Sequence, residues 1–224
     1  MEAFLRLKQM PPPSYDGLEI RLNHGSATIM TSPVLRATME GERSPWAGRF
    51  ISGTFILGGI AWIIIAVLVL GNLLAGAEIY TLGPASSRIV AGAGPGSWFT
   101  MGLLAYLVIG IVGVGMSALF YQHVESTLGA PLTGWKNAGG WVHLLLGGGG
   151  AAAASLLMAY AGFQAGAAAL ATNVGGGGHD TGYIHTNILS PVAMPIAALM
   201  GIALLGYLVG GIVLSTTWMK ARKM

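Results

Sequence analysis

Four long apolar stretches, separated by shorter segments rich in Gly, Pro and polar residues, dominate this chain of 224 residues. Each stretch is long enough to cross a bilayer as a helix, which takes about 20 apolar residues. Ser-Pro pairs at Ser44 and Ser190 are typical of a helix N-cap followed by Pro at the first helical position. The pattern predicts membrane-spanning helices over residues 50–77, 98–121, 141–167 and 190–218.

Composition agrees with this pattern. Hydrophobic residues make up 54% of the chain and charged residues 8%, whereas a soluble domain carries roughly a quarter charged residues. The chain therefore could not cover a globular surface, and we expect an all-α integral membrane protein with a four-helix transmembrane bundle. The absence of Cys excludes disulfides and thiolate metal ligands. The net charge is only +3 and the cations flank apolar spans, so we expect lipid and no nucleic acid as a partner.

The cations predict an orientation. Six of the eleven Lys and Arg lie in an N-terminal segment, 1–49, one lies in the 122–140 loop and three lie in a basic tail, 219–224. The loops on the other face hold only Arg88. By the positive-inside rule, both termini are expected to be cytoplasmic. The plasma membrane of a prokaryote is the expected location. In the N-terminal segment, which we expect to lie on the membrane or on a partner, short helices are predicted over residues 1–10 and 33–40.

This orientation makes a testable prediction. Cysteines introduced at Ala85 and Gly177 should react with an impermeant reagent added from outside, whereas a cysteine at Gly134 should not. Labelling of Gly134 with Ala85 protected would reverse the topology.

Few side chains on this scaffold could carry chemistry. No Asp, Glu, Lys or Arg lies near the centre of a predicted span, although such residues mark ion and proton paths in membranes. His123 and His143 lie near the same interface on adjacent helices, where two imidazoles could ligate the iron of a haem b. In the last loop His179, Asp180 and His185 could hold zinc or copper. The favoured interpretation of both sets is structural, so neither a bound cofactor nor a metal is expected.

Small residues recur at helical spacing instead. In the third span Gly147, Ala151 and Ser155 are four residues apart, a spacing that allows close helix–helix approach. Comparable positions occur on the second and fourth spans. The residues predicted to pack helices together are Gly110, Gly113, Ser117, Gly147, Ala151, Ser155, Gly206 and Gly210. Because four helices do not need so many small faces, some faces are expected to meet another subunit.

Two motifs resemble a known family. Phe99-Thr100-Met101-Gly102 is similar to the F-T-M-H-G signature in the second helix of haem–copper oxidase catalytic subunits, and the segment around His143 is similar to that family's H-F-W-L-x-x-I-G-x-N helix. The family's His in the first motif ligates the low-spin haem, but here Met101 is followed directly by Gly102. The resemblance therefore implies a relative without the catalytic site, similar to the small multi-span proteins that accompany terminal oxidases in archaeal respiratory complexes.

The expected function is a non-catalytic integral membrane subunit that packs within a larger, terminal-oxidase-type respiratory complex. Lipid or a quinone would bind at the seams between subunits. Two alternatives stay open: a haem-b and quinone membrane anchor with His123 and His143 as ligands, and a small homo-oligomeric transporter or channel.

Overall fold

A computed structural model describes residues 18–23, 26–31, 44–76, 89, 94–170 and 178–222. The chain divides into two compact units, Met1–Arg43 and Ser44–Met224. In the first unit, β1 (Leu18–Asn23) pairs antiparallel with β2 (Ser26–Thr31), with Leu18 opposite Thr31. This hairpin is not among the predicted elements, and the two short helices predicted in the same unit lie outside the described residues.

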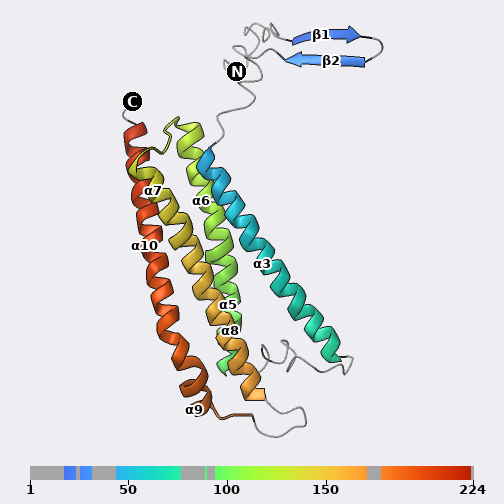
Figure 1. The fold of residues 1–224 in the computed structure, drawn as a ribbon, viewed down its shortest axis with the longest axis vertical. Helices are drawn as coiled ribbons and strands as arrows, with labels where there is room; N and C mark the ends of the chain where they lie inside the picture. Colours follow the sequence, from blue (N-terminus) through green and yellow to red (C-terminus); the bar gives the residue numbers. More distant parts are fainter. Residues whose placement is uncertain are drawn as a thin grey trace, which may run out of the picture. The chain divides into compact units, whose positions relative to one another are not determined.

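The second unit contains the four predicted membrane helices (Figure 1). The first span is a single helix, α3 (Pro45–Gly76). The second span comprises α5 (Ser97–Ala105), η2 (Tyr106–Val112), α6 (Gly113–Gln122) and η3 (His123–Thr127). The third span comprises α7 (Trp135–Val142), η4 (His143–Gly149) and α8 (Gly150–Leu170). The fourth comprises α9 (Thr181–Ile184), η5 (His185–Leu189) and α10 (Ser190–Ala221). The expected all-α membrane fold is confirmed, and the chain is a multi-pass membrane protein.

Three spans extend beyond the apolar runs that predict them. The second span continues to Thr127, the third begins at Trp135 and the fourth begins at Thr181. Polar groups satisfy the helix ends there: the Asp180 side chain accepts a hydrogen bond of 2.8 Å from the Tyr183 N–H and so caps α9. As a result, the connection between the second and third spans shortens to 128–134, and Glu125 becomes part of a helix.

The third span is the centre of the bundle. Half of its most apolar window is buried, against 6% for α3. α8 packs against α5 on one side and against α10 on another, and η4 packs against α10. α3 lies against α6 and diverges from the other helices toward its C-terminal end (Figure 1). Most of the α3 surface is therefore not covered by the other helices of the bundle.

Small residues make these close contacts. A side chain at Gly162 would overlap the backbone of Phe99, and one at Gly206 would overlap the backbone of Gly147. A Cβ at Gly150 would lie 3.2 Å from the Ala203 backbone nitrogen. Most small faces of the third span are thus covered within the chain, by α5 and α10. Gly149, where a Cβ would meet no atom within 4 Å, is an exception.

Candidate functional site

A polar stripe runs along one face of the second span. Ser117, Tyr121 and Glu125 follow one another at intervals of four residues, the spacing that places side chains on the same helix face. All three are buried. The stripe runs over nine residues, a rise of about 12 Å at 1.5 Å per residue. It lies at the end of the bundle where α3 begins, because its partners come from the start of α3 and from the third span.

Glu125 joins three segments at this end. Its carboxylate accepts hydrogen bonds from the Ser44 hydroxyl and, at 3.0 Å, from the Trp46 N–H. It also accepts the Leu132 N–H at 3.5 Å, at the limit of a hydrogen bond. The Ser44 hydroxyl in turn accepts the Ala47 N–H at 3.0 Å. Ser44 and Glu125 together satisfy N–H groups of the first turn of α3 that no helical carbonyl can reach, so the carboxylate fixes α3 to the end of the second span.

His143 is enclosed by side chains from the other three spans. Its Nδ1 lies 3.2 Å from the Tyr121 hydroxyl and its Nε2 lies 3.4 Å from the Ser117 hydroxyl. The Phe50 ring lies 5.0 Å from the imidazole and the Tyr207 ring 5.4 Å, centroid to centroid. Only 4% of His143 is exposed, so the residue is a buried packing element whose two nitrogens both face hydroxyl groups.

A glycine makes room for this imidazole. Any side chain at Gly210 of α10 would overlap the His143 ring, and a Cβ at Gly147 would lie 3.2 Å from its Cδ2. His143 also begins η4, a π-helical stretch, and such widened turns are frequent at functional sites. The fourth span therefore approaches the third so closely that no further atom fits between Gly210 and the ring.

The chemistry available to this cluster is hydrogen bonding between helices. Ser117 donates to the Gly113 carbonyl at 2.9 Å, so the hydroxyl that faces the imidazole is itself held by the helix backbone. Tyr207 donates to the Ile109 carbonyl at 3.2 Å and Tyr106 to the Leu57 carbonyl at 2.8 Å. These bonds join the second span to the fourth and to the first. In the low dielectric of a bilayer such bonds hold helices in register, because the alternative is an unsatisfied polar group.

The two histidines considered as haem ligands have separate surroundings. His143 is buried among Phe50, Tyr121 and Tyr207. His123 is exposed and lines a hollow of about 310 Å³ with Phe120 and Trp218, among other residues. Of the two rings, only that of His123 lines this hollow, while that of His143 is enclosed within the bundle.

The residues considered as metal ligands in the last loop are also dispersed. The His179 ring stacks on Tyr183 with centroids 4.0 Å apart, and Asp180 is the N-cap of α9. His185 is exposed at the start of η5. Among the described residues no three His, Cys, Asp or Glu side chains gather into a metal-binding group.

The predicted packing residues lie at helix contacts inside the chain. A Cβ at Gly110 would lie 3.7 Å from the Ala152 Cα, and one at Gly113 would lie 3.3 Å from the Tyr207 hydroxyl. Ala151 and Ser155 are 2% and 1% exposed, so they are interior residues of α8. Ser117, Gly147, Gly206 and Gly210 belong to the contacts described above.

Sequence reasoning missed Glu125 and Tyr121. The signal was present, because Ser117 and Tyr121 are four residues apart at the predicted end of the span and Glu125 follows after another four. Extending the helix by one turn would have placed all three on one face. The partners of Glu125 lie about eighty residues away, however, and local spacing does not reveal them.

Comparisons with known proteins identify no related protein. No protein-family model matches the chain, and no curated protein or solved structure is similar enough to it to count as a match. The resemblance to haem–copper oxidase subunits stays a prediction that rests on the two motifs alone.

Proposed function

We propose that this protein is a non-catalytic integral membrane subunit that packs against the helices of partner subunits in a larger membrane complex. The two sequence motifs point to a respiratory complex of the terminal-oxidase type as that assembly. Its role would be structural: it would pack against the outer helices of a partner subunit and hold that subunit in place. The chain has four apolar helices long enough to span a membrane, which is consistent with contact with lipid.

The observation that carries the proposal is the free surface of α3. Beyond Arg49 the helix carries no charged residue, yet among its side chains described as far as Leu74 the buried ones are Trp46, Ala47, Phe50 and Ala61. Beyond Ala61 its contact with the bundle is limited to partly buried residues such as Leu68. Gly58 and Gly59 lie in the middle of the helix, and a Cβ at either position would meet no atom within 4 Å. Small residues on a free transmembrane surface allow a second helix to approach closely.

The buried polar side chains support the same proposal. Glu125, His143, Ser117 and Tyr121 are engaged with each other or with the backbone, across spans of the same chain. Groups used in this way stabilise the fold. The outer apolar surface is then the part of the molecule that can contact a partner subunit. By contrast, the haem-anchor alternative needs imidazoles that are free to ligate iron, whereas both nitrogens of His143 face hydroxyl groups of the same chain.

The test is co-purification from the native membrane in mild detergent. The tagged wild-type chain should retain at least one other integral membrane subunit. Gly58→Leu and Gly59→Leu should each fold normally, because a Cβ at either position meets no atom of the chain within 4 Å, but should lose the partner. Overpacking a helix contact costs roughly 1–3 kcal/mol, enough to lower recovery several-fold or more. Gly211→Leu on α10, another open glycine, is the matched control and should retain the partner.

Different results would refute the proposal. A wild-type chain that purifies alone would show that it has no stable partner subunit. A monodisperse homo-oligomer that moves solute in liposomes would favour the transporter alternative. A haem absorption band in the isolated chain, lost in His143→Ala, would favour the anchor.

A further inference from the structure

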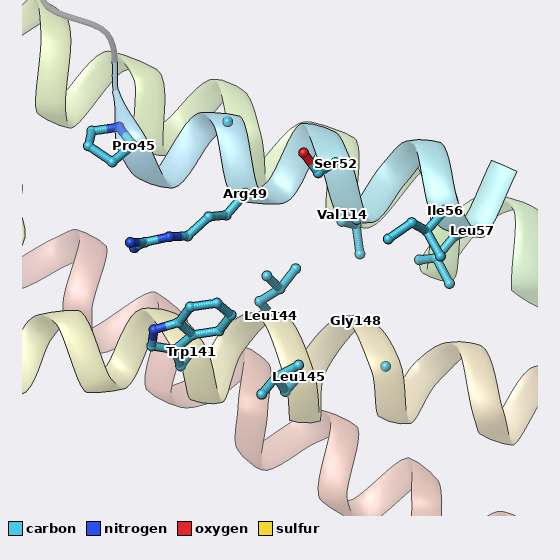
Figure 2. Close-up of a pocket in the computed structure, with 13 residues that line it drawn as sticks. Pro45, Arg49, Ser52, Ile56, Leu57, Val114, Trp141, Leu144, Leu145 and Gly148 are labelled. Atoms are coloured by element: carbon cyan, nitrogen blue, oxygen red, sulfur yellow. The ribbon is translucent and has the colours of Figure 1, made fainter. Parts of the chain in front are cut away.

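A long groove lies between α3 and the third span, at the end of the bundle where α3 begins (Figure 2). Its volume is about 600 Å³. The wall is almost entirely apolar, with Ile56 and Leu57 from α3 facing Leu144 and Leu145 from η4. Gly48 and Gly149 also line it, and a Cβ at either position would meet no atom within 4 Å. Because glycine has no side chain, these two positions leave space inside the groove on both helices.

The length of the groove matches one leaflet of a bilayer. Its α3 wall runs from Pro45 to Leu57, about 18 Å at 1.5 Å per residue. Half of the hydrocarbon core of a bilayer is about 15 Å thick. The two lengths are similar, so a single acyl chain that enters at the interface can follow most of the groove within one leaflet.

The side chain of Arg49 lies at the interfacial end of this apolar groove. Arg49 extends from α3 toward Trp141 beside Pro45 (Figure 2). Its guanidinium carbon lies 4.4 Å from the centroid of the Trp46 ring and 5.1 Å from that of Trp141. Contacts with two aromatic faces restrain the guanidinium and leave its N–H groups able to donate in the plane of the fork.

The acidic residues described in this unit are engaged elsewhere. Glu125 accepts hydrogen bonds from Ser44 and from the Trp46 and Leu132 N–H groups, and Asp180 caps α9. Among the residues that the structure describes, Arg49 thus has contacts with aromatic rings but no carboxylate partner. A cation at the edge of the hydrocarbon region favours a nearby counter-charge, which the phosphate of an anionic lipid would supply.

We propose that the groove binds one anionic phospholipid of the surrounding membrane, with its phosphate on Arg49 and one acyl chain along the wall between Ile56 and Leu145. The planar guanidinium matches a phosphate through two parallel hydrogen bonds. A neutral quinone ring would fill the groove but leave the cation without its counter-charge, and a partner helix would need an acid at this depth. The lipid site is independent of the proposed packing function, because the groove is complete within the chain.

The experiment is native mass spectrometry of the full-length chain, released from nanodiscs that contain equal amounts of phosphatidylglycerol and phosphatidylcholine with identical acyl chains. We expect one phosphatidylglycerol to be retained in preference to phosphatidylcholine. Arg49→Gln should weaken this retention roughly tenfold to a hundredfold, the range expected for a lost charge-assisted hydrogen-bonding partner. Excess inorganic phosphate should not displace the lipid, since the acyl chain contributes to binding.

A second variant tests the groove without changing the charge. Gly149→Leu should abolish retention by filling the groove, while the fold should be preserved because a Cβ at this position meets no atom within 4 Å and the rest of the side chain can extend into the groove. Gly211→Leu on α10 is the matched control, also at an open glycine but outside the groove, and should retain the lipid as the wild type does.

Three results would overturn the proposal. These are equal retention of the two lipids by the wild type, unchanged retention in both Arg49→Gln and Gly149→Leu, and a dimer of this chain that Gly149→Leu alone dissolves. The last would show that a second copy occupies the groove. Because the readout needs no partner subunit, it can fail or succeed whatever co-purification shows.

Discussion

Alanine at Gly162 should force the second and third spans apart. A Cβ at this position would overlap the Phe99 nitrogen and the Trp98 carbonyl carbon, both of which are backbone atoms. No rotamer change can relieve that overlap, so α5 must move as a whole. Overpacking of this kind costs roughly 1–3 kcal/mol or more. We expect a clear fall in the thermal denaturation midpoint of the detergent-solubilised chain, followed by the loss of the monodisperse peak on gel filtration.

Gly149→Ala is the control for this prediction. It makes the same chemical change in the same span, but the added methyl group meets no atom within 4 Å. Alanine is favoured over glycine in a helix interior by about 1 kcal/mol, so the denaturation midpoint should stay the same or rise. Equal midpoints for Gly162→Ala and Gly149→Ala would mean that α5 and α8 are not in backbone contact.

The second large effect is expected for Glu125→Ala. The substitution removes the acceptor for the Ser44 hydroxyl and for the Trp46 and Leu132 N–H groups, all at the end of the bundle where α3 begins. A buried donor left without a partner costs about 1–3 kcal/mol. We expect a lower denaturation midpoint and faster hydrogen exchange at the Trp46 N–H, because the first turn of α3 loses its cap.

Glu125→Gln separates the hydrogen bonds from the charge. The amide keeps one acceptor oxygen and nearly the same shape, so most of the stability should return. A Glu125→Ala chain as stable as the wild type, with unchanged exchange at Trp46, would contradict the role assigned to the carboxylate.

The sequence predicts the four helices because a lipid environment allows few alternatives. Apolar runs of sufficient length must form helices, since backbone groups find no other partners in hydrocarbon. The helix ends are less predictable, because polar residues such as Asp180 extend a helix by capping it. The hairpin also had a signal: apolar Leu18, Ile20 and Leu22 alternate with polar residues, the period of a strand.

The candidate site could be predicted only in part. His143 is conspicuous in the sequence, but its enclosure depends on Gly210, which allows the fourth span to approach the ring. Glu125 follows the apolar run by a few residues, and its role depends on Ser44 and Trp46 in a different span. Spacing along one helix predicts which side chains share a face. It does not predict which distant backbone groups that face will meet.

The bond between Ser44 and Glu125 also bears on the time course of synthesis. The two residues are 81 positions apart, so the start of α3 leaves the ribosome well before the carboxylate that caps it. At roughly 5–20 residues per second, the interval is about 4–16 seconds. During that time α3 is in the membrane without its anchor, free to tilt and rotate among lipids. Its start can be anchored only when the end of the second span arrives, so α3 depends for its position on a helix that is made after it.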